Sequence, residues 1–118
     1  MVRMGIALVS VLALFGNAKA QEADTLGWFM KGAYAGEYQA SMVFASGETL
    51  ASLNSLLKDR GEAPLYCPPP ALQLTSGQYV SILANYLKSS KTASATDDYR
   101  AFPIYVREAL SVTFPCKV

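Results

Sequence analysis

The residues of this chain that could perform chemistry are two adjacent carboxylates and two cysteines. Asp97 and Asp98 could act as a general acid and base, as could Glu37 with a partner elsewhere. The segment around Asp97 is the most polar of the chain, so we expect both carboxylates to be solvated or to cap a helix. The chain has no histidine, which excludes a histidine base for any serine nucleophile. We therefore predict that the protein is not an enzyme.

The two cysteines, Cys67 and Cys116, could bind a metal, take part in redox chemistry or form a disulfide. Without histidine, and without a C-x-x-C motif, the first two uses are disfavoured. Two cysteines in an exported domain of this size typically pair. We therefore predict a disulfide, no metal and no cofactor. In the chain-entropy model, closing a loop of about 50 residues stabilises the fold by about 4 kcal/mol.

The N-terminus has the features of a secretory signal peptide. Arg3 precedes a run, Gly5–Phe15, in which Ser10 is the one polar residue, and residues 18–20 form an A-x-A cleavage motif. The alternative is a membrane anchor, which needs about twenty apolar residues, whereas this run is eleven residues long. We predict a cleaved signal peptide at residues 1–20 and a single periplasmic domain at residues 21–118, with no stable membrane anchor.

Removal of the predicted signal peptide leaves little net charge. It takes away Arg3 and Lys19, so ten basic residues become eight against nine acidic ones, a formal net charge of −1. Nucleic-acid binding requires clustered lysine and arginine, and no such cluster stands out. We therefore expect no nucleic-acid partner.

In the first half of the mature chain, residues 26–45 have helical spacing. Gly32 and Gly36 lie four residues apart, on one face of such a helix. We expect them to admit another helix at close range, although the alternative is that they merely weaken this one. Ser46 and Gly47 are expected to break the helix.

Capping residues position the next two helices. Leucines at helical spacing over residues 50–57 predict a short amphipathic helix, and Gly61 suits the left-handed conformation that ends it. Thr75 and Gln78 have the spacing of a capping box. They predict a helix that runs to about Lys88.

The remainder of the chain is organised around prolines and one more helix. Pro68–Pro70 form a stiff extended segment, which we interpret as a structural elbow rather than a ligand for an aromatic groove. Ser89–Asp98 reads as an exposed polar loop or a frayed helix end. The last helix is expected to begin near Tyr99–Pro103. Its apolar face is expected to consist of Phe102, Val106, Ala109, Leu110 and Thr113.

The sequence therefore predicts an all-α fold: a small disulfide-closed bundle of about four helices after a cleaved signal peptide. The seven tyrosines could serve this bundle in two ways. Tyrosine occurs in cores with its hydroxyl at the rim, and it is also enriched in protein interfaces. Both uses remain open from the sequence.

The segment between the cysteines carries short motifs in a characteristic order. They are Cys67-Pro68, Thr75 with Gln78, Tyr86-Leu87, Ala109-Leu110 and Phe114-Pro115-Cys116. In this order the chain resembles the periplasmic Rap/Tai family of type VI secretion immunity proteins. Residues 30–36 are similar to that family's Cys-x-Gly-Tyr-x-x-Gly motif, with Met30 in the place of the cysteine. The resemblance covers most of residues 26–116.

The resemblance implies a helical protein that binds and occludes a secreted cell-wall-degrading toxin, a peptidoglycan hydrolase. It also implies a homodimer, and Met30 implies that one of the family's two disulfides is missing. Binding of this kind relies on a few aromatic or arginine anchors. The candidate anchors are Tyr38, Arg60, Tyr99 and Arg100.

A second family gives an alternative function. Acid-activated periplasmic chaperones of the Hde type are also small, helical and closed by one disulfide over a similar span. Such a protein exposes apolar surface when its carboxylates are protonated at low pH. The motifs beside the cysteines favour the immunity protein. A third possibility is an exported protein with the same fold and a different partner.

Overall fold

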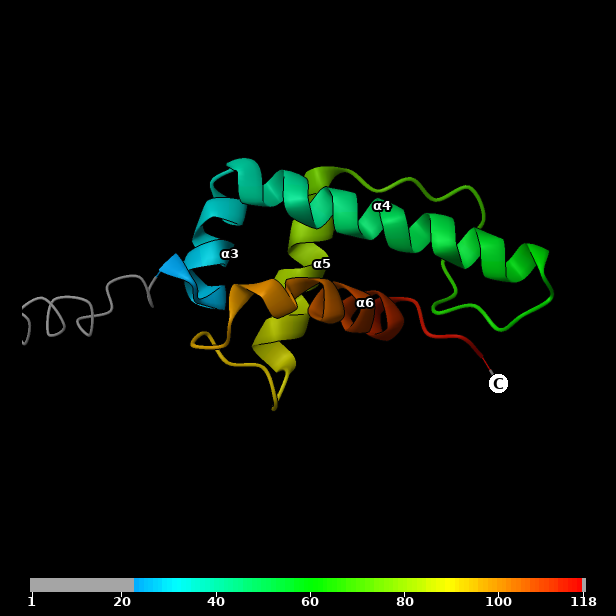
Figure 1. Ribbon diagram of the computed structural model, residues 1–118. Helices are drawn as coiled ribbons and strands as arrows, with labels where there is room; N and C mark the ends of the chain where they lie inside the picture. Colours follow the sequence, from blue (N-terminus) through cyan, green and yellow to red (C-terminus); the bar gives the residue numbers. More distant parts are fainter. Residues whose placement is uncertain (1–22, 118) are drawn as a thin grey trace, which may run out of the picture.

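The computed structural model describes residues 23–117 (Figure 1), so the predicted signal peptide lies outside the described residues. The elements are α3 (Leu26–Tyr34), α4 (Tyr38–Asp59), α5 (Ser76–Ser89), the 3-10 helix η1 (Tyr99–Ala101) and α6 (Phe102–Thr113). Across these residues there is no strand beyond an isolated bridge between Thr25 and Asp98. The predicted all-α fold of about four helices, closed by a disulfide, is confirmed.

The helices pack around one core. Figure 1 shows α4 lying along α6, with α5 crossing the pair and α3 at the end where α4 begins. All four helices contribute to the centre of this bundle. The largest fully buried side chains are Phe29, Val43, Leu83, Val106 and Leu110. The core therefore joins the first half of the chain to the segment between the cysteines.

The predicted break at Ser46 and Gly47 is wrong, because α4 continues through both residues. Gly47 is buried where α4 meets α5, and a Cβ there would overlap the ring of Tyr79. The chain turns earlier, at Gly36, whose φ of +73° is a conformation that glycine adopts without strain. Glycine thus has a packing role at one position and a turning role at the other.

Gly32 and Gly36 do not share a helix face, contrary to expectation. Gly36 lies beyond the end of α3, whereas Gly32 is buried within it. The side chain of Gln39, from the start of α4, occupies the space where a Cβ on Gly32 would lie. The expected close approach of a second helix is therefore confirmed at Gly32 alone.

The capping predictions for the later helices are confirmed. The Thr75 hydroxyl accepts from the Gln78 N–H, and the Gln78 side chain accepts from the Thr75 N–H at 2.8 Å, which completes the capping box. Gly61 has a φ of +70° just after α4. On α6 the expected apolar face is buried except at its last position, where Thr113 is exposed. The helix ends there, so no neighbouring element covers that side chain.

The predicted disulfide joins Cys67 to Cys116, with their Cα atoms 4.9 Å apart. A backbone hydrogen bond from the Cys67 N–H to the Phe114 carbonyl (2.8 Å) lies beside it. The chain that follows α4 is therefore fastened to the chain that follows α6. Because these two segments carry little regular structure, the crosslink fixes them relative to the helices.

A buried asparagine organises the same region from within. Asn54 of α4 is 4% exposed. Its Nδ2 donates to the Tyr66 carbonyl (2.8 Å), and its Oδ1 accepts from the Leu65 N–H (2.7 Å). The side chain thus supplies partners that a strand or helix would otherwise provide for the backbone of residues 65–66.

Candidate binding site between α3 and α5

The structure places the four predicted anchors in three separate locations. Tyr38 begins α4 and is 60% exposed, and Arg60 caps the other end of the same helix. A helix of 22 residues is about 33 Å long, so these two side chains belong to different surfaces. Tyr99 and Arg100 lie together in η1, beside the beginning of α3.

Tyr99 and Arg100 are engaged within the protein. The Tyr99 ring stacks on that of Phe29, with ring centroids 5.6 Å apart. The Arg100 guanidinium is 2.8 Å from an Asp98 carboxylate oxygen and 3.6 Å from one of Asp24. Exposed pairs of this kind contribute little to stability, but they direct the guanidinium towards its own chain.

Of the two adjacent carboxylates, Asp98 caps a helix, as expected, whereas Asp97 is half-buried and fastens the loop. Asp98 accepts from the Arg100 N–H at 2.9 Å and so begins η1. Asp97 accepts from the Ser94 N–H and from the Tyr105 hydroxyl, each at 2.8 Å. These two bonds favour the charged form and lower the pKa of Asp97. Neither carboxylate is poised as a general base.

The tyrosines differ in burial: the core use that the sequence left open is confirmed for two of them, and the interface use stays a prediction. Tyr66 and Tyr79 are buried in the core. Burial, with a smaller contribution from the charge on Glu48, raises the pKa of Tyr79 to about 12. Tyr34 and Tyr38 are each 60% exposed. The exposed pair flanks the turn between α3 and α4, and Tyr34 also lines a pocket.

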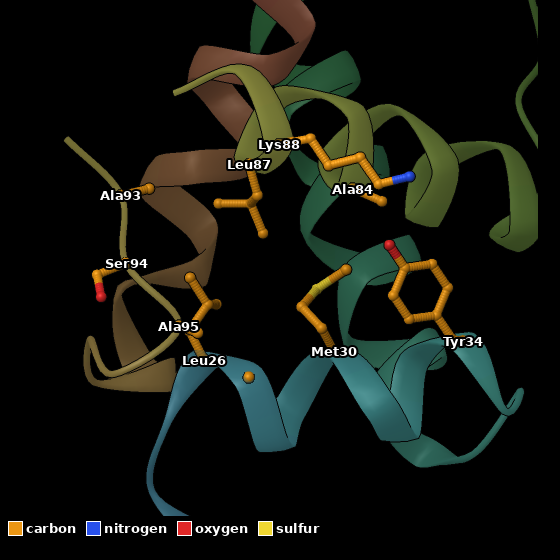
Figure 2. Close-up of a pocket in the computed structure, with 10 residues that line it drawn as sticks. Leu26, Met30, Tyr34, Ala84, Leu87, Lys88, Ala93, Ser94 and Ala95 are labelled. Atoms are coloured by element: carbon orange, nitrogen blue, oxygen red, sulfur yellow. The ribbon is translucent and has the colours of Figure 1, made fainter. Parts of the chain in front are cut away.

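That pocket lies between α3, the end of α5 and the loop that follows α5, and its volume is about 230 Å³. Its walls are mainly apolar or small. They are formed by Leu26, Gly27, Met30, Tyr34, Ala84, Leu87, Lys88, Ala93, Ser94 and Ala95. Figure 2 shows Met30 reaching up from α3 and Leu87 reaching down from α5 into the space between the helices. This concave apolar surface is the candidate functional site.

The loop wall is held in place by backbone hydrogen bonds to the first turn of α3. The Gly27 N–H donates to the Ala95 carbonyl (2.9 Å), and the Leu26 N–H donates to the Asp97 carbonyl (2.7 Å). A Cβ on Gly27 would lie 3.2 Å from the Ala95 carbonyl oxygen, so glycine permits this close approach. The loop predicted as Ser89–Asp98 is therefore polar and largely exposed, but fastened to α3.

Small side chains keep the pocket open. Ala84 projects from α5 and Ala93 and Ala95 from the loop, while Gly27 of α3 adds no side chain. Larger residues at these positions would occupy the space that α3 and α5 enclose. The space in the pocket therefore depends on the small size of these four residues.

Two polar groups lie at the mouth of the pocket. Figure 2 shows the Tyr34 hydroxyl pointing towards the side of α5 that carries Ala84 and Lys88. The Lys88 ammonium lies above the same side of the pocket. Within residues 23–117 both ion pairs are made by Arg100, so Lys88 has no acidic partner there. The mouth therefore presents an unpaired positive charge beside an apolar interior.

The lining residues can bind a ligand but contain no activated nucleophile. The Ser94 hydroxyl pairs with that of Thr96 at 2.9 Å. Over the described part of the chain, no group of three or more His, Cys, Asp or Glu residues could hold a metal ion. The chemistry that this site offers is recognition of an apolar group next to an anionic one.

Comparison with known proteins adds no relative, since no family model, no curated protein and no solved structure matches the chain. Among residues 23–117, none of the helices has both the length and the apolar character needed to cross a bilayer.

Sequence reasoning did not identify the pocket. The residues that line it come from three segments of the chain. In the sequence, its apolar lining residues are indistinguishable from ordinary core positions of two amphipathic helices. One signal was present, since Gly27 and the alanines of the 93–95 loop are small residues where two segments meet. That signal gains meaning only once the pairing of the loop with α3 is known.

Proposed function

We propose that the protein is an exported binding protein, and that the pocket between α3 and α5 is part of its binding surface. The observation that carries this proposal is the combination of an open apolar pocket with the unpaired Lys88 and the exposed Tyr34 at its mouth. Binding sites are typically apolar hollows with a few directed polar groups. The disulfide supports a location in an oxidising compartment, which we propose is the periplasm.

The more specific proposal is an immunity protein that binds and occludes a cell-wall-degrading type VI secretion effector. Its support is the resemblance of the Cys67–Cys116 segment to the Rap/Tai family. Several motif residues build the framework of this fold: Thr75 and Gln78 cap α5, and Phe114 pairs with Cys67. The toxin, a peptidoglycan hydrolase, is proposed from the resemblance. Occlusion would place the α3–α5 surface against its catalytic cleft.

The test is inhibition of a hydrolase in a defined mixture. The protein, expressed from its full-length gene, is combined with the peptidoglycan hydrolase encoded nearest to it, and the release of soluble cell-wall fragments is measured. Stoichiometric inhibition supports the proposal. A hydrolase that remains fully active at a tenfold excess of the protein contradicts it. Light scattering of the protein alone also tests the homodimer that the resemblance implies.

An acid-activated chaperone of the Hde type is the second candidate, and Asp97 favours it. The pKa of Asp97 lies below its ordinary value of 3.8 because this carboxylate accepts from Ser94 and Tyr105. Protonation in strong acid would therefore weaken two hydrogen bonds that hold the loop wall of the pocket. A chaperone should bind a hydrophobic dye and suppress client aggregation near pH 2. A protein that stays folded and inert in that acid is not such a chaperone.

A further inference from the structure

We propose that the pocket between α3 and α5 receives one aliphatic side chain of the partner, from a segment rich in carboxylates. This inference rests on the proposed binding function and specifies its chemistry.

The size of the pocket suits a single side chain. An apolar cavity of about 150 Å³ holds a benzene molecule, so the 230 Å³ available here accommodates one leucine or methionine side chain. Pockets for cofactors and drug-sized ligands are typically about 300–1,000 Å³. A long acyl chain would leave most of its methylene groups in water, which removes the main contribution to its binding. A side chain presented by a protein segment fits this volume best.

The charges around the mouth favour an acidic segment. Lys88 lies at the rim, and Lys91 begins the stretch of loop that leads to Ala93. Lys31 follows Gly27 by one helical turn, which places it on the same face of α3. All three lysines are exposed, and none forms an ion pair within residues 23–117. A carboxylate-rich segment would find these ammonium groups without displacing any internal partner.

The acidic side chains near the mouth of the pocket do not neutralise these lysines. Asp97, three residues beyond Ser94, is engaged by the Ser94 N–H and the Tyr105 hydroxyl. Glu37 is exposed at the start of α4, on the far side of the turn after Tyr34. The Tyr34 hydroxyl at the mouth can donate to a carboxylate or accept from a backbone N–H of the bound segment. The rim is therefore equipped for an anion and the interior for an aliphatic group.

Short peptides test the inference directly, without the toxin. The ¹⁵N-labelled protein, expressed from its full-length gene, is titrated with acetyl-Glu-Glu-Leu-Glu-Glu-amide and observed by NMR. Two control peptides replace the central leucine by alanine, or the four glutamates by lysine. We expect saturable shifts at the amides of Met30, Leu87 and Ala93, and affinities at least tenfold weaker for both controls. Loss of one buried aliphatic side chain changes affinity by about that factor.

Matched variants establish where the peptide binds. Lys88→Glu and Lys58→Glu both reverse a charge in the last turn of a helix, so their effects on the helix dipole are alike. Only Lys88→Glu should weaken the leucine peptide, by about tenfold. Tyr34→Phe removes the hydroxyl at the mouth, and Tyr38→Phe is its equally exposed control. Neither pair alters the buried core.

Several results would overturn the inference. It would be overturned if the leucine peptide gave no saturable shift, or if all three peptides bound equally well. It would also be overturned if Lys88→Glu and Lys58→Glu weakened binding equally, or if decanoate bound more tightly than the leucine peptide. The last result would assign the pocket to a lipid-like ligand. Because these assays use no hydrolase, peptide binding with an uninhibited hydrolase would reject only the immunity function. Inhibition that persists unchanged in Lys88→Glu would reject only this inference.

Discussion

Replacement of Asn54 by alanine should cost about 3 kcal/mol of stability. The side chain is buried, and it provides partners for three backbone groups: the Leu65 N–H at 2.7 Å, the Tyr66 carbonyl at 2.8 Å and, at the longer distance of 3.4 Å, the Tyr66 N–H. An alanine removes the side-chain partner of all three groups, which are buried or partly buried. Each unsatisfied group of this kind costs about 1–3 kcal/mol, and the sum is a large fraction of the stability of a domain this small.

Urea unfolding followed by circular dichroism measures this loss. With a slope of about 1.5 kcal/mol/M for a small domain, the Asn54→Ala variant should unfold at about 2 M less urea than the natural protein. Asn85→Ala is the control, since Asn85 is an exposed asparagine on α5 and should shift the midpoint very little. Equal midpoints for the two variants would refute the role assigned to Asn54.

A third variant separates the hydrogen bond that Asn54 donates from those that it accepts. Asn54→Asp keeps an acceptor for the Leu65 N–H but cannot donate to the Tyr66 carbonyl while its carboxyl is charged. Burial raises the pKa of such a carboxyl. The variant should therefore be less stable than the natural protein at neutral pH and should recover part of the difference as the pH falls. A stability difference that does not change with pH would contradict this assignment.

Three further predictions follow from the fold. Reduction of the Cys67–Cys116 disulfide should lower the free energy of unfolding by about 4 kcal/mol in the chain-entropy model, measured by urea unfolding with and without a reductant. Gly47→Ala should lower the free energy of unfolding by about 1–3 kcal/mol, because the added Cβ would meet the Tyr79 ring. Gly77→Ala adds its Cβ in open space on α5 and should stabilise the protein slightly. Calorimetric melting compares the two variants. The pKa of Asp97 in the folded protein lies below 3.8, so its contribution to stability is complete above that pH and is lost as the pH falls through the folded value. Asp97→Asn should therefore make the free energy of unfolding depend less on pH in strong acid. A pH dependence that does not change in this variant would contradict the prediction.

The features that could be predicted from the sequence are those encoded by neighbouring residues. The capping box at Thr75 and Gln78 and the turn glycine Gly61 depend on contacts within a few positions, and both are present as expected. The apolar face of α6 follows from its spacing. The pairing of Cys67 with Cys116 followed from the number of cysteines and the predicted export, and it needed no geometric detail.

The errors occurred where a distant contact determines the role of a residue. The sequence predicts a helix break at Gly47, yet the ring of Tyr79, 32 positions later in the chain, explains why a glycine lies there. Asn54 was not singled out, because a polar residue among leucines on a helix looks like part of a solvated face. Its partners, Leu65 and Tyr66, are known only from the folded structure.

The candidate site was the least predictable feature for the same reason. Residue type alone points to four anchors, and packing distributes them over three places: Tyr38, Arg60, and Tyr99 with Arg100. The pocket exists because the loop after α5 pairs with the first turn of α3 through Gly27. No local pattern in either segment specifies that pairing.

Survival of cells during competition with their own kind tests the central claim most directly. A strain of the source organism that lacks this gene is mixed with its parent, and survivors are counted after complementation with the natural gene, Lys88→Glu or Lys58→Glu. The proposed immunity function predicts that the deletion strain is killed. The natural gene and Lys58→Glu should restore survival, and Lys88→Glu should restore it poorly. A deletion strain that survives as well as its parent, while that parent kills other bacteria through type VI secretion, would contradict the proposed immunity function.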